Sequence, residues 1–124
     1  MTLKILLLVP SWNQFINHSH WVMVKEKKKW EKHVWMAGVF AKAGGHLHIR
    51  WMLPVYEKRK VRITSYRKRL IDKDNLCLKP VMDALVKTGF LKDDSPKWCE
   101  STVSQRKCEK GEEPYTAIEL EQTK

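Results

Sequence analysis

The alternation of apolar and polar residues along the chain predicts strands and two helices. Residues 3–9 are apolar apart from Lys4 and stop at Pro10, which predicts a buried strand followed by a loop. Residues 21–42 contain no proline, and apolar residues recur there every three, four or seven positions, so a helix that ends at Gly44 is expected. The apolar stripe of this helix comprises Met23, Trp30, Val34, Ala37 and Ala41.

Two further strands are expected in the middle of the chain. In the first of them, Leu47, Ile49, Trp51 and Leu53 alternate with His46, His48, Arg50 and Met52, and Pro54 ends the segment. Residues 60–66 alternate in the same way, with Val61 and Ile63 placed between polar neighbours. A period of two residues is that of a strand with one buried face.

A second, shorter helix is expected at residues 76–87. Its apolar residues share one helical face, and they are Leu78, Val81, Met82 and Leu85. Pro80 falls near the first turn, where a missing N–H matters least, and Gly89 supplies the stop. Residues 98–107 and 115–121 complete the pattern and are expected to pair as a terminal hairpin.

Length and charge narrow the class of protein. A chain of 124 residues fits one domain, residues 1–124, of the α/β (α+β) class with a mixed β-sheet and two main helices. Its 24 Lys and Arg residues against 14 Asp and Glu residues give a net charge of +10, which favours a nucleic-acid partner.

The three cysteines lack both the even count of a disulfide framework and the C-x-x-C spacing of many zinc sites. No stretch reaches the length of a membrane span or of a signal segment. We therefore expect a cytoplasmic, nucleoid-associated protein with free thiols, no membrane contact and no small-molecule cofactor.

Two acidic pairs flank the second expected helix of this basic chain. Asp72 and Asp74 precede the helix, and Asp93 and Asp94 follow it. Residues two apart in an extended segment point to one side, so the first pair can converge on one ion, and the helix can return the chain to place the second pair opposite. Mg²⁺ is usually held by a few carboxylates, several waters and substrate phosphate. The pairs therefore predict a divalent-metal site, and such a site in a polyanion-binding surface suggests phosphodiester chemistry.

The order of these residues resembles the RusA family of Holliday junction resolvases, also called crossover junction endodeoxyribonucleases. The opening strand with Pro-Ser-Trp-Asn at 10–13, the closing pair of strands and the chain length are also similar. The specific part of the resemblance lies in a basic strand end at 67–69, D-x-D-N at 72–75, Lys79, D-A-L at 83–85, Gly89 and D-D-S at 93–95.

The resemblance implies a Mg²⁺-dependent endonuclease, with Mn²⁺ able to substitute, that resolves four-way junctions by paired cleavage in DNA recombination and repair. It places metal ligands at Asp72, Asp74 and Asp94, with Asp93 as the alternative to Asp94, and the catalytic lysine at Lys79. Relative to the family pattern, the chain has one extra residue between Asp74 and Lys79. Paired cuts need two active sites related by a two-fold axis, so a homodimer on branched double-stranded DNA is expected.

Basic residues cluster directly before the acidic pairs. Their density favours phosphate contacts over a solvated strand edge. Asn75 is placed either to cap the second helix or to touch the DNA backbone, and Trp12 is placed to stack on an unpaired base. The expected DNA-binding residues are Asn13, Lys58, Arg59, Lys60, Arg62, Arg67, Lys68, Arg69 and Asn75.

Structural roles compete with these interpretations. Asp74 or Asn75 can cap the second helix, and Asp83 lies four residues from both Lys79 and Lys87, which favours a structural ion pair. The main alternative function is a non-catalytic nucleic-acid-binding module whose aspartates cap a helix and pair with the basic strand. A nuclease of the same chemistry that acts on flaps or other branched substrates is a further alternative.

Overall fold

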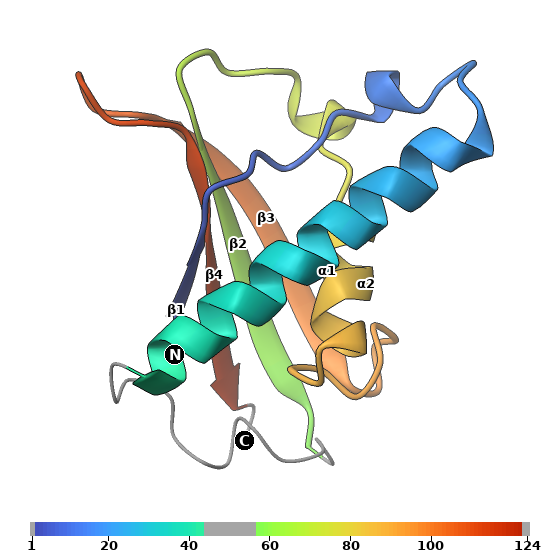
Figure 1. Ribbon diagram of the computed structural model, residues 1–124, viewed down its shortest axis with the longest axis vertical. Helices are drawn as coiled ribbons and strands as arrows, with labels where there is room; N and C mark the ends of the chain where they lie inside the picture. Colours follow the sequence, from blue (N-terminus) through green and yellow to red (C-terminus); the bar gives the residue numbers. More distant parts are fainter. Residues whose placement is uncertain (1, 44–56, 123–124) are drawn as a thin grey trace.

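The computed structural model describes residues 2–43 and 57–122, which form a four-stranded mixed sheet and two α-helices (Figure 1). The expected α/β (α+β) class is confirmed. The strand expected at residues 47–53 lies outside the described residues. In chain order the elements are β1 (Thr2–Ile5), the 3-10 turn η1 (Trp12–Gln14), α1 (His20–Ala43), β2 (Arg59–Arg67), the 3-10 turn η3 (Lys73–Asn75), α2 (Lys79–Lys87), β3 (Cys99–Lys107) and β4 (Tyr115–Gln122).

The strands lie in the order β1-β4-β2-β3, so the expected terminal hairpin is wrong. β2 pairs with β3 in parallel and with β4 antiparallel, and it therefore separates these two strands. The physical reason is burial: β2 buries Val61, Ile63 and Ser65, as suits a central strand, whereas most side chains of β3 are exposed, as suits an edge. α2 lies in the crossover connection that a parallel pair requires.

β1 is shorter than the apolar run that predicts it. It ends at Ile5, which pairs with Thr116 near the beginning of β4, so little of the partner strand remains beyond this point. The chain then leaves the sheet, and the Thr116 hydroxyl donates a hydrogen bond to the Leu7 carbonyl at 2.6 Å. Val9 is still fully buried, so the apolar run continues into the core as an irregular segment.

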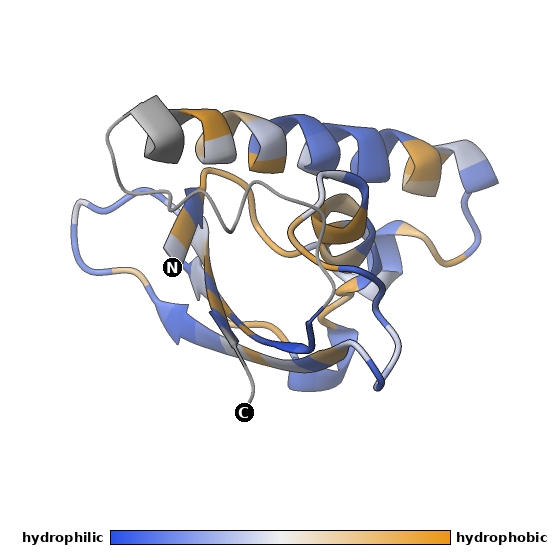
Figure 2. Cartoon of the chain, turned by 90° about the horizontal axis from the view of Figure 1, so that it is seen from below, coloured by the Kyte–Doolittle hydropathy of each residue, from blue (hydrophilic) through white to orange (hydrophobic). Residues whose placement is uncertain are grey.

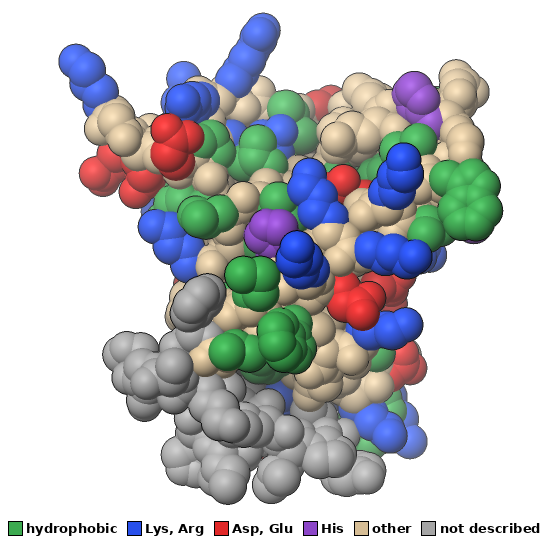
Figure 3. Space-filling model, viewed as in Figure 1, with side chains coloured by type: hydrophobic (Ala, Val, Ile, Leu, Met, Phe, Trp, Pro, Cys, Tyr) green, Lys and Arg blue, Asp and Glu red, His purple; other side chains and the backbone are tan. Residues whose placement is uncertain are grey.

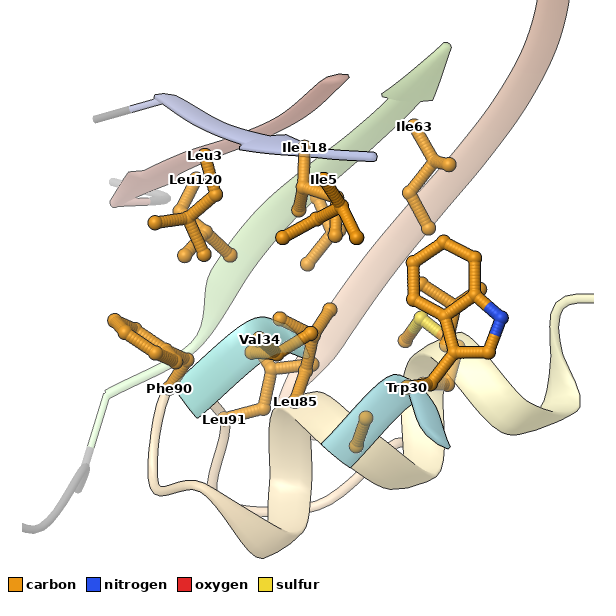
Figure 4. Close-up of a cluster of buried hydrophobic side chains, with 14 of the residues drawn as sticks. Leu3, Ile5, Trp30, Val34, Ile63, Leu85, Phe90, Leu91, Ile118 and Leu120 are labelled. Atoms are coloured by element: carbon orange, nitrogen blue, oxygen red, sulfur yellow. The ribbon is translucent and has the colours of Figure 1, made fainter. Parts of the chain in front are cut away.

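Both helices cover the same face of the sheet, and the core lies between these two layers (Figures 1 and 2). Figure 4 shows side chains of the sheet meeting those of α1, α2 and the segment after α2. Burying one large apolar side chain contributes about 1.5–3 kcal/mol. The labelled core side chains are Leu3, Ile5, Ile63, Ile118 and Leu120 from the sheet, and Trp30, Val34, Leu85, Phe90 and Leu91 from the helical layer.

α1 buries the middle of the predicted apolar stripe. Trp30 and Val34 are fully buried, and Ala37 packs against the core. Gly38 allows a close approach, since a Cβ at this position would lie 3.0 Å from Cζ of Phe90. Among the helices of the described residues, none combines the length and the apolar character that a membrane span needs.

The predicted start and stop signals of α2 are confirmed. The helix begins at Lys79 with Pro80 in its first turn, and it ends before Gly89, whose φ of +89° suits glycine. The Thr88 hydroxyl donates to the Ala84 carbonyl at 2.7 Å and closes the last turn. α2 therefore separates a loop at its beginning from a loop at its end, and each loop carries one acidic pair.

Candidate functional site

The loop between β2 and α2 carries the first acidic pair. Oδ1 of Asp72 accepts a hydrogen bond from the N–H of Asp74 at 3.1 Å, and the Asp72 carbonyl accepts one from the N–H of Asn75 at 2.9 Å. Asp72 thus caps η3, and the Asp74 side chain is exposed. The expectation that Asp74 or Asn75 caps the second helix is wrong, because Leu78 occupies the cap position of α2 and forms no side-chain cap.

The N-terminal loop lies against this acidic loop. The N–H of Cys77 donates to the Pro10 carbonyl at 2.8 Å, and Ser11 forms an isolated antiparallel bridge with Leu76. Figure 1 shows η1 and η3 near the same end of the sheet. η1 carries Trp12 and Asn13, both exposed, so these residues lie in the loop that borders the acidic loop. The sequence pattern does not indicate this neighbourhood, because it depends on non-local pairing.

A side-chain clamp holds the acidic loop to β3. The Gln105 amide accepts a hydrogen bond from the Ile71 N–H at 3.1 Å and donates one to the Ile71 carbonyl. Ile71 directly precedes Asp72, so the clamp fixes the backbone that carries the first carboxylate. Sequence reasoning misses Gln105, since only the pairing of β2 with β3 brings it to the loop.

We expect Gln105→Leu to loosen the acidic loop without unfolding the protein. The loss of two partly buried hydrogen bonds costs about 1–3 kcal/mol of free energy of unfolding. Hydrogen exchange measured by NMR should become faster at the Ile71 and Asp74 amides and stay unchanged in β4. Thr102→Leu, at an exposed position of the same strand, is the matched control. Equal exchange rates in the two variants would show that Gln105 does not hold the loop.

Asp93 and Asp94 lie beyond the other end of α2. The N–H of Asp94 donates to Oδ1 of Asp93 at 2.8 Å, and both side chains are exposed. Together with Asp83 and Lys27 they line a cleft of about 430 Å³ between α1 and α2. Asp83 pairs with Lys27 at 2.9 Å, so the expected structural ion pair forms with a lysine of α1 rather than within α2.

The two acidic pairs do not meet in the described part of the chain. α2 lies between them, and its nine residues span roughly 13 Å at a rise of 1.5 Å per residue. Within residues 2–43 and 57–122, no three His, Cys, Asp or Glu side chains are grouped closely enough to hold a metal ion. Each pair nevertheless offers two carboxylates, which is a sufficient number for Mg²⁺ when waters and substrate phosphate complete its coordination.

None of the four carboxylates has a basic partner among the described residues. The ion pairs there join Lys27 to Asp83, Arg59 to Glu57, and Arg62 to Glu119. Carboxylates that only balance basic side chains should be paired in a chain of net charge +10. The two acidic pairs are therefore accessible to a cation.

Arg59 is a correction to the expected DNA-binding set. Its side chain is 2% exposed, because its position on β2 faces the core. Nη1 donates to the Phe90 carbonyl at 2.6 Å, and Nε donates to the Glu57 carboxylate at 3.1 Å. Arg59 therefore ties β2 to the segment after α2 and does not reach a DNA phosphate.

Two other arginines of the expected set have structural partners. Nη1 of Arg67 donates to the Val9 carbonyl at 2.9 Å, and burial lowers the pKa of this guanidinium. Arg62 is half exposed and pairs with Glu119 across neighbouring strands. The remaining residues of the set are at the surface: Asn13, Lys68 and Arg69 are exposed, and Lys58, Lys60 and Asn75 are partly exposed.

Lys79 is the first residue of α2, and its side chain is exposed. It directly follows the loop of Asp72 and Asp74, so the expected catalytic lysine and the first acidic pair share one end of α2. This arrangement places a cation beside two carboxylates without an ion pair between them among the described residues.

The three cysteines are free thiols, as expected, and two of them are buried. Burial raises the pKa of Cys77, although a hydrogen bond from the Lys79 backbone opposes this rise, and burial also raises the pKa of Cys99. We expect an aromatic disulfide reagent at pH 8 to react with the partly exposed Cys108 in the native protein, and with the other two thiols only in denaturant. Native-state reaction that persists in Cys108→Ser would contradict this burial.

Protein-family models give no match to the chain, and curated protein sequences give none either.

Proposed function

We propose that this protein is a Mg²⁺-dependent, structure-selective endodeoxyribonuclease that resolves four-way junctions by paired phosphodiester cleavage in DNA recombination and repair. The observation that carries the proposal is the set of exposed carboxylates at both ends of α2, which have no ion-pair partner among the described residues of a strongly basic chain. Their order along the chain, together with Asn75 and Lys79, is the order on which the resemblance to the RusA family rests.

Asp72, Asp74 and Lys79 form the proposed cleavage centre. A Mg²⁺ ion, or Mn²⁺ in its place, would polarise the scissile phosphate and lower the pKa of the attacking water. Asp72 and Asp74 are the residues that would hold it, and Lys79 neutralises the charge that develops on the phosphate. Asp94, with Asp93 beside it, provides a second metal position at the other end of α2.

Branched double-stranded DNA is the proposed substrate. Lys68 and Arg69 are exposed directly before the acidic loop, and Asn13 is exposed in the neighbouring loop, so phosphates near the cleavage centre have polar and cationic partners. Such contacts recognise shape and charge and weaken steeply with salt. A homodimer supplies two cleavage centres related by a two-fold axis, as paired cuts require.

The proposal is tested by incubating the protein with a labelled four-way junction, a flapped duplex and a linear duplex, each with Mg²⁺, Mn²⁺ or EDTA. The expected result is metal-dependent, symmetrically paired nicks in the junction and none in the linear duplex. Cutting of the flap instead of the junction would assign the enzyme to another branched substrate. No cutting with either metal would overturn the proposal that this protein is an enzyme.

A non-catalytic nucleic-acid-binding module is the second candidate. It is favoured by the local roles of Asp72, which caps η3, and of Asp93, which accepts the Asp94 N–H, and by the separation of the two pairs. For such a module, Asp72→Ala lowers the thermal stability and leaves junction affinity unchanged. If Asp72 is a metal ligand, Asp72→Ala abolishes junction cleavage. The thermal stability then changes little, because relief of the repulsion between Asp72 and Asp74 offsets the loss of the cap.

A further inference from the structure

A hollow between α1 and α2 combines lysines from both helices with an exposed tryptophan. Its volume is about 640 Å³, and it is lined by Lys28, Glu31, Lys32 and Trp35 of α1, by Lys87 at the end of α2, and by Thr88. Lys28, Lys32 and Trp35 follow one another at spacings of four and three residues, so they share one face of α1. This face points away from the core, because Trp30 and Val34 are buried on the opposite side.

The charge of this hollow is positive. Three lysines face one carboxylate, that of Glu31, and none of the three lysines has an ion-pair partner within residues 2–43 and 57–122. The Thr88 hydroxyl already donates to the Ala84 carbonyl, so the lysines are the main donors to a ligand. An anionic ligand with a repeating charge matches three ammonium groups better than a single small anion does.

Trp35 adds an apolar surface at the wall of the hollow. It is 61% exposed, although a tryptophan is among the residues that gain most from burial. Figure 3 shows this face of the molecule, with Lys side chains over α1 and apolar side chains near both ends of the helix. A flat aromatic surface beside ammonium groups suits the bases and phosphates of a single nucleic-acid strand.

The hollow is continuous with the cleft that carries the second acidic pair. Lys28, Glu31 and Lys87 line both, and the cleft also contains Asp93 and Asp94. A strand that lies in the hollow would therefore extend toward the second acidic pair. A flat anionic membrane fits this site less well, because the cationic surface is concave.

We propose that this hollow is a binding subsite for single-stranded nucleic acid. Lys28, Lys32 and Lys87 bind successive phosphates, and Trp35 stacks on a base. The subsite is distinct from the cleavage centre at Asp72 and Asp74, and it gives the proposed nuclease affinity for unpaired segments beside a branch point. This role rests on the proposed function only in the choice of a branched DNA substrate, since binding of a single strand is measured without cleavage.

The test measures the affinity for a fluorescein-labelled oligothymidylate by fluorescence anisotropy in EDTA. Lys28→Glu/Lys32→Glu should weaken binding about tenfold or more and reduce the slope of log affinity against log salt by about 1.4. The charge-matched control is Lys4→Glu/Lys110→Glu, whose two exposed lysines lie on β1 and in the turn before β4. This control should bind within about threefold of the wild type, since it makes the same change in net charge and removes the contact of Lys4 with the Tyr115 ring, but leaves the hollow unchanged.

A second pair of variants tests the stacking. Trp35→Ala should weaken binding about fivefold or more, as expected when a base loses an aromatic stacking partner. Trp21→Ala is the matched control, because Trp21 is 64% exposed on the same helix but does not line the hollow. Circular dichroism and thermal melting of all variants establish that each one is folded.

The outcomes separate the subsite from the cleavage centre. Equal effects of the two double variants, or of the two tryptophan variants, would overturn the subsite even if the wild type cuts junctions. Loss of binding to anionic vesicles in Lys28→Glu/Lys32→Glu, with oligothymidylate binding unchanged, would overturn it in favour of a membrane site. If the wild type does not cut DNA but the variants show the expected differences in affinity, the subsite is supported and the proposed nuclease function is wrong.

Discussion

Replacing Asp74 by Asn is expected to reduce Mg²⁺-dependent cleavage of a four-way junction by about 1,000-fold while the protein stays folded and still binds the junction. Removing the charge weakens the hold of the acidic loop on the metal ion and hence its stabilisation of the transition state. The Asp74 side chain is exposed and has no ion-pair partner among the described residues, so the fold loses little. Single-turnover cleavage, junction affinity in EDTA and the thermal midpoint should be measured on one preparation.

Asp83→Asn is the matched control for this prediction. It makes the same chemical change one helix turn from Lys79, but it removes only a partly exposed ion pair with Lys27, which contributes about 0–1 kcal/mol. Cleavage by Asp83→Asn should stay within about threefold of the wild type, since this carboxylate is not a proposed ligand. If both variants cut the junction at the wild-type rate, Asp74 is not a metal ligand and the cleavage centre is wrong.

Arg59→Met is expected to lower the free energy of unfolding by about 3 kcal/mol. The substitution keeps an unbranched apolar side chain but leaves the Phe90 carbonyl without its hydrogen bond at 2.6 Å and the Glu57 carboxylate without its pair at 3.1 Å. Unpaired polar groups left at a buried position cost several times more than a surface ion pair contributes. Urea unfolding followed by circular dichroism gives the free energy directly.

Arg62→Met provides the comparison on the same strand. Arg62 is 49% exposed and pairs with Glu119 at 3.3 Å, so its loss should change the free energy of unfolding by less than about 1 kcal/mol. For DNA affinity the expected order is reversed: Arg62→Met should weaken binding more than Arg59→Met, because only Arg62 is accessible to a phosphate. Equal losses in the free energy of unfolding for the two substitutions would show that the buried contacts of Arg59 stabilise the fold no more than the surface pair of Arg62 does.

Local periodicity predicts the helices and β2 because the information needed lies within each segment. The stripe that contains Trp30 and Val34 defines the buried face of α1, and Pro80 and Gly89 mark the ends of α2. The same reasoning also finds β3 and β4, but it assigns them the wrong partners, since strand pairing is non-local and the more apolar β2 lies between them.

In the candidate site, too, local features can be predicted from the sequence and non-local contacts cannot. The exposure of the acidic pairs follows from their loop positions, whereas the approach of Pro10 and Ser11 to the acidic loop and the clamp at Gln105 depend on tertiary packing. A signal for Arg59 was present in the sequence. Arg59 lies two residues before Val61 and four before Ile63. Because alternate residues of a strand point to the same side, Arg59 is placed on the buried face.

The insertion of β4 between β1 and β2 has a consequence for synthesis on the ribosome. β4 follows every other described element, yet β1 pairs only with β4 within the described sheet. While the chain is being made, Leu3 and Ile5 have no strand partner within the described sheet until β4 has emerged. The complete sheet therefore cannot form until β4 has been synthesised, and until then the nascent chain can expose the apolar segment at residues 3–9 to chaperones.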